Sequence, residues 1–452
     1  MRYIPHTPED ERAMLEAIGA ESVDALFQPI PAELRLRQEL DLPAALPEAD
    51  LKDAVERLAG RNQDATRALS FVGAGLYNHY IPAAVREVTS RGEFYTAYTP
   101  YQPEVSQGTL QAIFEYQTMI ARLLGMEVSN ASMYDGSTAA AEAVLMARRI
   151  HKGKRPLVVV AGALHPEWLQ VIRTYLTQPE QTLRYVRWGD DGRVDRAALA
   201  AALGPDVAAV LVQSPNFFGC VEDLEAVRAA TLPHGILLAA CFSEALSFGL
   251  LKPPGHDAAD IVAGEGQSFG MPLSFGGPLL GIMATKKEYV RAIPGRLVGK
   301  TADRNGRDAY VITLATREQH IRREKATSNI CTNEGLCALT AAVYLSLLGN
   351  DGMRKLALLN HRTSLLLARR LLTVPGVSLP FARTPWFNEF VVELPVPAQT
   401  LCDRLADDGI VPGVLLSRFF ADQPNRLLVT ATEANRPADL ERLTQAMRGA
   451  LK

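Results

Sequence analysis

The sequence is 452 residues long and almost balanced in charge, with 47 Lys and Arg against 50 Asp and Glu. This balance argues against a nucleic-acid-binding protein, and no segment approaches the roughly 18 consecutive apolar residues of a membrane helix. The five cysteines include no Cys-x-x-Cys pair, which argues against a disulfide framework or a zinc ribbon. We therefore expect a cytoplasmic protein of about two or three domains, with no metal, membrane or nucleic-acid partner.

The first part of the chain is predicted to form a helical arm. Thr7 and Asp10 have the spacing of a capping box at a helix start, and Gly19 is the residue type that ends a helix. A second short helix is expected near 22–29. Residues 1–65 carry too little apolar surface to fold alone, so we expect this arm to pack on another surface.

From Ser106 onwards, helices alternate with short apolar runs. This alternation predicts a large α/β domain over 66–350, with a mostly parallel sheet covered by helices on both faces. The expected strands are 157–161, 183–187, 207–213, 236–241, 260–263 and 279–284. The expected helices are 106–124, 166–177, 194–203, 222–230, 286–293 and 333–348. Ligands bind beyond the carboxyl ends of such strands, so the loops after Gln213, Cys241 and Ala263 should surround any site.

The last part of the chain, 351–452, changes character and predicts a smaller α+β domain. Its expected helices are 353–373, 398–409 and 437–450, and its expected strands are 387–394 and 426–430.

The segment 73–80 begins like a dinucleotide-binding fingerprint. Asn78 stands where the third glycine would be, and no clear strand precedes the segment, so a nicotinamide dehydrogenase is disfavoured. The alternative is a glycine turn with Tyr77 and Tyr80 packed in the core. Asn78 and His79 remain candidate binding residues.

The segment 93–108 combines aromatic, amide and proline residues before a helix. Prolines fix the backbone in advance, and each tyrosine offers an apolar body with a polar tip. This composition fits a loop that binds a small polar ligand, and it fits an interface loop equally well. The candidate residues are Tyr95, Tyr98, Tyr101, Gln102 and Glu104.

Two further regions have the composition of a ligand site. In 134–143, a glycine and two hydroxyl residues lead directly into a helix, so backbone N–H groups there can hold a phosphate, although ordinary capping looks the same. The region 260–278 has five glycines in 19 residues, and the polar segment 320–332 precedes a helix. Tight turns around a packed sheet are the alternative for both.

Four sequence stretches together resemble the P-protein of the glycine cleavage system. They are YTAYTPYQPEVSQG, YDGSTAAAEA, GEGQSFGMPLSFGGP and IRREKATSNICTNE, and they follow one another over 95–334. The resemblance extends over essentially the whole chain. In length, the chain resembles the N-terminal half of that family, which is the α subunit of its split form. The resemblance implies an aspartate-aminotransferase-like (type I) pyridoxal-phosphate fold.

The family's reaction implies the partners. Glycine forms a Schiff base with pyridoxal phosphate, carbon dioxide leaves, and the aminomethyl group passes to the lipoyl arm of the H-protein. The expected partners are a β subunit, in an α2β2 assembly, and the lipoylated H-protein.

One residue of the family pattern is missing. A type I enzyme holds its cofactor on a lysine, but alignment on Pro272 places Gln267 at that position. Glu244 lies near the place of the acidic residue that faces the pyridine nitrogen. The resemblance therefore implies that pyridoxal phosphate binds to the β partner, and that this chain has no catalytic residue of its own.

This chain would then contribute loops to the partner's site. Asn78, His79 and the five residues of the segment 93–108 are expected near the substrate, and Thr327, Ser328 and Asn329 near the phosphate of the partner's cofactor. Two alternatives remain open. The chain is an autonomous pyridoxal-phosphate enzyme that uses Lys325 or Lys252, or it is a purely structural partner.

Overall fold

The computed structural model describes residues 5–36, 38, 40–64, 67–257 and 259–452. The chain divides into two compact units, Met1–Gln63 and Asp64–Lys452. The predicted boundary between residues 65 and 66 lies outside the described residues. The predicted large and small domains together form the second unit, and each unit is described below by itself.

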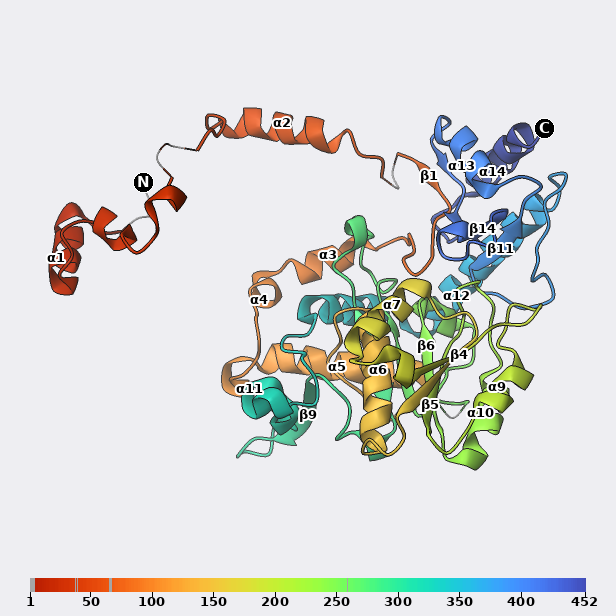
Figure 1. The fold of residues 1–452 in the computed structure, drawn as a ribbon, viewed down its shortest axis with the longest axis horizontal. Helices are drawn as coiled ribbons and strands as arrows, with labels where there is room; N and C mark the ends of the chain where they lie inside the picture. Colours follow the sequence, from red (N-terminus) through yellow and green to blue (C-terminus); the bar gives the residue numbers. More distant parts are fainter. Residues whose placement is uncertain (1–4, 37, 39, 65–66, 258) are drawn as a thin grey trace. The chain divides into compact units, whose positions relative to one another are not determined.

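The first unit is an arm of short helices (Figure 1). Helix α1 (Pro8–Ile18) starts with the predicted capping box of Thr7 and Asp10, and Gly19 ends it with a φ of 70°. The predicted second helix is only a 3-10 turn, η1 (Asp24–Phe27), and a second turn, η2 (Ala32–Leu34), follows. Helix α2 (Glu48–Ala59) was not predicted, because the proline-rich stretch before it resembles a loop. Neither α1 nor α2 buries any of its residues.

The second unit is built on a mixed seven-stranded sheet of order β2-β8-β7-β6-β5-β3-β4. Strands β4, β3, β5, β6 and β7 are parallel, whereas β8 runs antiparallel to both β7 and β2. The strands are β2 (Val128–Ser129), β3 (Leu157–Ala161), β4 (Leu183–Val186), β5 (Val207–Gln213), β6 (Leu237–Phe242), β7 (Ile261–Glu265) and β8 (Gly281–Thr285). All six predicted strands are present within two residues of their expected starts.

Helices cover both faces of this sheet because alternate strand residues point to opposite sides. Val159 and Val210 pack in one cluster with α5 and α12, whereas Val158 and Leu211 pack in another with α6 and α7. The helices of this part are α3 (Ala83–Thr89), α4 (Gly92–Tyr95), α5 (Gln107–Leu124), α6 (Gly136–Ile150), α7 (Pro166–Tyr175), α8 (Pro179–Thr182), α9 (Arg196–Ala202), α10 (Leu224–Thr231), α11 (Gln319–Arg322) and α12 (Gly335–Leu371).

Three details differ from the sequence prediction. The expected helix 286–293 is one 3-10 turn, η7 (Lys287–Tyr289). The hairpin of β9 (Leu297–Ala302) and β10 (Asp308–Thr313) was not predicted, because its half-exposed polar residues resemble a loop. The helices expected at 333–348 and 353–373 are the two parts of α12, which breaks at Gly349 with a φ of 58°.

Helix α12 is also long and apolar enough to cross a membrane, by length and composition only. Its buried residues pack with α5 and with the 3-10 turn η5 (Ala245–Gly249) in the main core, as in the core helix of an α/β protein.

The C-terminal part is a small antiparallel sheet of order β11-β14-β13 with helices beside it. Its elements are β11 (Glu389–Glu393), α13 (Ala398–Ala406), β12 (Ile410–Val411), β13 (Val414–Leu415), β14 (Arg426–Thr430) and α14 (Pro437–Ala450). The short strand β1 (Leu69–Ser70) pairs with β12. The segment after β1 therefore runs from this two-stranded pair to the ends of β6 and β7, where Tyr77 contacts Ser243 and Gln267.

Candidate functional site

The segment 73–80 lies at the carboxyl ends of β5, β6 and β7, where Tyr77 contacts Ser243 and Gln267. We call this buried cluster of side chains the inner pocket, and its central residues are Tyr77, Gln213, Ser243, Gln267 and Glu389. All five side chains are buried.

Gln267 is the residue that was expected at the lysine position, and it is fully engaged in hydrogen bonds. Its side chain is 1% exposed, its Oε1 accepts a hydrogen bond from the Tyr77 N–H at 3.0 Å, and its Nε2 donates to the Met271 carbonyl at 2.6 Å. An amide makes both bonds at once because it has a donor and an acceptor, whereas a lysine has no acceptor for the Tyr77 N–H.

Tyr77 and Glu389 close the inner pocket from the side of the small sheet. The Tyr77 hydroxyl lies 3.1 Å from Ser243 Oγ and donates to Glu389 Oε2 at 3.1 Å. Glu389 Oε1 accepts from the Ala74 N–H at 2.6 Å. A Cβ atom at Gly73 would lie only 2.3 Å from Glu389 Oε1, so glycine is required for this close approach. Burial raises the pKa of Glu389 to about 7.

His79 lies at the edge of the inner pocket between two buried carboxylates. Its Nε2 is 2.9 Å from Glu244 Oε2 and its Nδ1 is 2.9 Å from Glu433 Oε2. Burial alone lowers the pKa of His79, but the two carboxylates outweigh it and raise the pKa to about 10. Besides its contact with His79, Glu244 Oε2 accepts a hydrogen bond from Asn388 Nδ2 at 3.0 Å. Its carboxylate is thus engaged by other side chains of the chain.

The start of α6 was predicted as a phosphate cradle. Asp135 caps it by accepting from the Thr138 N–H at 2.8 Å, and the Gly136 N–H donates to Glu265 Oε2 at 2.8 Å. The Ser137 hydroxyl donates to Asp135 Oδ1. The cradle is thus occupied by carboxylates of the chain itself.

Pyridoxal phosphate does not fit the inner pocket. The lysine position holds a glutamine whose polar atoms are both engaged, the expected pyridine partner Glu244 pairs with His79, and Glu265 takes an N–H group of the phosphate cradle. Lys252 pairs instead with Glu225 and Asp257 at the surface. No chemical step is therefore derived from a cofactor bound to this chain.

The tyrosine loop, residues 93–108, forms a different site. Tyr95 and Tyr98 are exposed, Tyr98 to 82%, as are Gln102 and Glu104. Tyr101 is anchored: its hydroxyl accepts from Arg296 at 3.2 Å, and the guanidinium lies 5.3 Å from its ring centroid.

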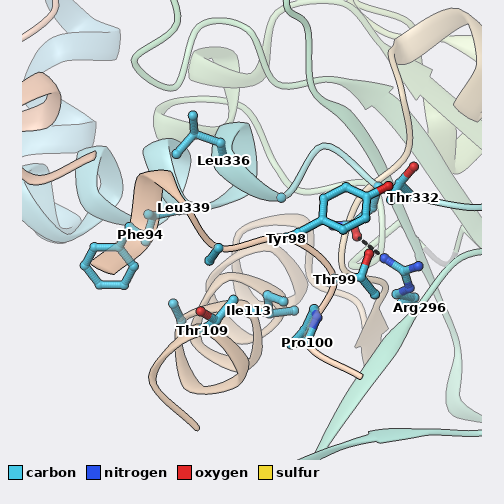
Figure 2. A pocket seen from close by; sticks show the side chains of 14 residues that line it. Phe94, Tyr98, Thr99, Pro100, Thr109, Ile113, Arg296, Thr332, Leu336 and Leu339 are labelled. Atoms are coloured by element: carbon cyan, nitrogen blue, oxygen red, sulfur yellow. Dashed lines mark hydrogen bonds between the residues drawn. The ribbon is translucent and has the colours of Figure 1, made fainter. Parts of the chain in front are cut away.

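Tyr98 also lines a cavity of about 290 Å³, called the outer pocket (Figure 2). Its walls combine apolar side chains with a few polar ones from the tyrosine loop, α5, the residue before β9, the segment before α12 and the start of α12. The lining residues are Phe94, Ala97, Tyr98, Thr99, Pro100, Thr109, Ala112, Ile113, Arg296, Thr332, Asn333, Gly335, Leu336 and Leu339.

Arg296 is the one charged side chain that lines the outer pocket, and sequence reasoning missed it. It is buried, its Nε lies 3.5 Å from Glu318 Oε2, and its guanidinium donates to Asn333 Oδ1 at 3.3 Å. Arg296 and Tyr101 are far apart in sequence, and no local motif marks the arginine.

The structure joins two of the predicted segments, 134–143 and 320–332. The Ser328 hydroxyl donates to the buried carboxylate of Glu142, and the Tyr134 hydroxyl accepts from the Cys331 N–H at 3.1 Å. Burial raises the pKa of Glu142. The backbone of this loop is held as well, because the Thr327 N–H donates to the Arg317 carbonyl at 2.9 Å and the Asn329 carbonyl accepts from Gln319 at 3.1 Å.

The predicted site residues thus belong to different hydrogen-bond networks. His79 and Gln267 are buried in and beside the inner pocket, whereas the tyrosine loop is exposed. Asn78 is exposed, and its carbonyl accepts from Thr432 Oγ1 at 2.6 Å. The expectation that Tyr80 packs in the core is wrong, because it is 69% exposed.

Comparisons with known proteins find similar proteins that match this chain over nearly its whole length. The family described as glycine cleavage system P-protein matches residues 1–447. A protein of Anaeromyxobacter dehalogenans named probable glycine dehydrogenase (decarboxylating) subunit 1 is 50% identical over 451 residues, which cover 99% of this chain and 100% of that protein.

Two solved structures are also similar. A crystal structure of glycine decarboxylase (P-protein) of the glycine cleavage system, in inhibitor-bound form, has a TM-score of 0.88 and 44% identity, with both chains fully covered. Glutamate decarboxylase of Lactobacillus brevis, at 13% identity and a TM-score of 0.67, covers 93% of this chain and 96% of its own, and shares the fold alone.

Proposed function

Because this chain belongs to the glycine cleavage system P-protein family, we propose that it is subunit 1 of a split glycine decarboxylase that acts together with a second subunit. The observation that carries the proposal is the similarity to a subunit 1 over 99% of this chain and 100% of the relative. The enzyme as a whole is a pyridoxal-phosphate enzyme of fold type I, whose cofactor acts as an electron sink when glycine loses carbon dioxide.

The contacts in the inner pocket support different roles for the two subunits. We infer that the second subunit holds pyridoxal phosphate, because Gln267 stands at the lysine position and Tyr77, Glu389 and Glu265 fill the surrounding space. The chain alone is then inactive. The alternative of an autonomous enzyme would need Lys252 or Lys325, and Lys252 is paired at the surface.

This chain's part in the reaction lies in its tyrosine loop. The loop offers polar groups on a backbone fixed by prolines, at Tyr95, Tyr98, Gln102 and Glu104. The hydrogen bond between Arg296 and Tyr101 holds the loop in place. Such a loop can orient a small polar substrate such as glycine and exclude water at an interface. We propose that it completes the active site of the second subunit.

The segment Thr327, Ser328 and Asn329 is proposed to face the phosphate of the partner's cofactor. Its backbone is held by Arg317 and Gln319, and the Ser328 hydroxyl is committed to Glu142. The backbone N–H groups of Ser328 and Asn329 and the Thr327 hydroxyl are therefore better suited to the phosphate than the Ser328 hydroxyl itself.

The arm is proposed to dock on the second subunit. Residues 1–63 include 13 Asp and Glu but 7 Lys and Arg, and their leucines are widely exposed. An acidic segment with exposed apolar side chains fits a basic and apolar partner surface.

We further propose an α2β2 assembly and transfer of the aminomethyl group to the lipoyl arm of the H-protein. We also propose a cytoplasmic location, which the five free cysteines support.

Absorption spectroscopy tests the proposal directly. The chain alone, the second subunit alone and their mixture are each given pyridoxal phosphate, treated with borohydride and assayed for release of carbon dioxide from labelled glycine. We expect the cofactor to be trapped on the second subunit only, and glycine to be decarboxylated only by the mixture. Trapping on a lysine of this chain would overturn the division of labour.

A further inference from the structure

The carboxylate of Glu265 sits in a nest of backbone N–H groups. Its Oε2 accepts from Gly136 at 2.8 Å, and its Oε1 accepts from Gln267 and Leu280, both at 2.9 Å. The three donors come from the start of α6, the end of β7 and the residue before β8. Glu265 itself is buried.

This arrangement is that of an anion site at a helix N-terminus. Helix α6 is 15 residues long, and its first backbone N–H groups and its dipole favour a negative charge at this end. A Cβ atom at Gly136 would lie 2.9 Å from Glu265 Cβ and 2.5 Å from Trp168, so only glycine lets the carboxylate approach the helix this closely. Each N–H of the nest has a side-chain carboxyl oxygen of Glu265 as its acceptor.

We propose that the carboxyl group of Glu265 occupies the phosphate position of this chain's own inner pocket as a built-in acceptor for its N–H groups. In this role it takes the place of an external phosphate group, so the native chain binds neither pyridoxal phosphate nor free phosphate there. The pocket becomes a closed structural element that holds the start of α6 against β7 and β8. This inference concerns the chain by itself and goes beyond the proposed function.

The inference has a consequence for a variant without the carboxylate. Removing the side chain of Glu265 leaves three buried N–H donors without acceptors, which lowers the stability of the fold. It also leaves an empty space of roughly the size of the lost group. Such a nest regains its acceptor if a small anion enters it. Inorganic phosphate is the probe that tests for this, because it matches the group that a helix N-terminus binds.

The experiment compares full-length wild type, Glu265→Ala and Glu265→Gln by thermal unfolding in phosphate and in chloride at equal ionic strength. We expect Glu265→Ala to have the lower Tm in chloride and to gain at least about 2 °C more from phosphate than the wild type gains. Glu265→Gln fills the same space without a charge, so it should gain no more than the wild type. Binding of labelled phosphate should show one site per chain in Glu265→Ala and none in the wild type.

If Glu265→Ala does not fold by itself, the refolding yield replaces the Tm, and phosphate should raise that yield more than chloride does. The inference is overturned if phosphate helps Glu265→Ala no more than Glu265→Gln, or if the wild type binds phosphate at this site. The second subunit is not required, so the result is independent of whether the proposed glycine decarboxylation holds.

Discussion

The imidazole of His79 is held 2.9 Å from the carboxylate of Glu244, and both side chains are almost fully buried. The other ring nitrogen lies equally close to Glu433, which follows strand β14 of the small sheet. A protonated imidazole thereby joins the segment 73–80 to the large and small sheets at once. Two buried carboxylates with one cation leave a net negative charge, which the side-chain amides of Asn388 and Asn360 stabilise by donating to Glu244 and Glu433.

The first prediction concerns the cation at this junction. His79→Leu keeps an apolar side chain of similar size but leaves both carboxylates buried without a positive partner, so the free energy of unfolding should fall by about 3–5 kcal/mol. Urea unfolding followed by circular dichroism measures this loss. Asn78→Ala is the matched control, because that exposed side chain adjoins His79, and its effect should stay within about 0.5 kcal/mol. A loss below about 1 kcal/mol in His79→Leu would contradict the ion-pair role.

The second prediction is a pH dependence with a definite sign. The pKa of His79 is raised from 6.5 to about 10 in the folded chain, so the folded state binds the proton more tightly than the unfolded state. Its stabilising effect is complete below pH 6.5 and is lost as the pH rises towards 10. The Tm of the wild type should therefore fall between pH 7 and 10, and that of His79→Leu should fall less. Parallel curves for the two proteins would show that another group is responsible.

Buried carboxyl groups act in the same direction at lower pH. Burial raises the pKa of Glu222, Glu265 and Glu389 from 4.5 to about 7 in each case. Their ionisation costs more in the folded chain, so their contribution to stability falls as the pH rises from 4.5 to 7.

Local signals in the sequence were sufficient for much of the fold. The capping box of Thr7 and Asp10 was predicted because its bonds join residues three apart. The buried strands were predicted because each is a continuous apolar run, and β14 and α14 have the predicted bounds. The hairpin of β9 and β10 was missed because one end of it is exposed and charged.

The site was harder to predict because its bonds join residues that are distant in sequence. Tyr77 and Glu389 are 312 residues apart, and Gln107 and Tyr310, which fasten the tyrosine loop to β10, are 203 apart. Gln267 was identified only through the family resemblance. Glu265 was missed, although an acidic residue between two glycines at the end of a strand is a signal for a carboxylate held close to backbone.

The third prediction tests whether a lysine alone can restore the cofactor site. Gln267→Lys removes the acceptor of the Tyr77 N–H and leaves Glu265 and Glu389 in place. We expect no pyridoxal group on this lysine after incubation with pyridoxal phosphate and borohydride, as measured by mass spectrometry of the intact chain. The second subunit, treated in the same way, is the positive control. Efficient trapping at position 267 would show that the inner pocket is open.

The fourth prediction concerns the arm. A chain that begins at Asp64 retains the whole second unit, whereas it loses an acidic segment whose Leu34, Leu36 and Leu42 are exposed to 74%, 76% and 72%. Its Tm should stay within about 2 °C of that of the full chain. Its association with the second subunit, followed by analytical ultracentrifugation, should be weakened at least about tenfold, because the apolar contacts of the arm are lost. Equal affinity of the two chains would exclude the arm from the interface.

The last prediction separates a role of the tyrosine loop in the active site from a role in packing alone. The Tyr98 hydroxyl is exposed, so Tyr98→Phe should leave the Tm and the assembly with the second subunit unchanged. If that hydroxyl contacts the substrate, glycine decarboxylation by the assembled enzyme should fall by about 2- to 10-fold, the effect of one hydrogen bond. Tyr185→Phe, an exposed tyrosine on β4, is the matched control and should keep full activity.

A loss of assembly in Tyr98→Phe would instead indicate a packing role, and unchanged turnover together with normal assembly would remove Tyr98 from the proposed site. The hydroxyl of Tyr101 already accepts a hydrogen bond from Arg296, so Tyr101→Phe should act differently. It should loosen the loop and lower both the Tm and the activity, because a buried guanidinium loses one of its acceptors. A lower Tm in Tyr101→Phe alone, with activity lowered in both variants, would distinguish the residue that contacts the substrate from the residue that positions the loop.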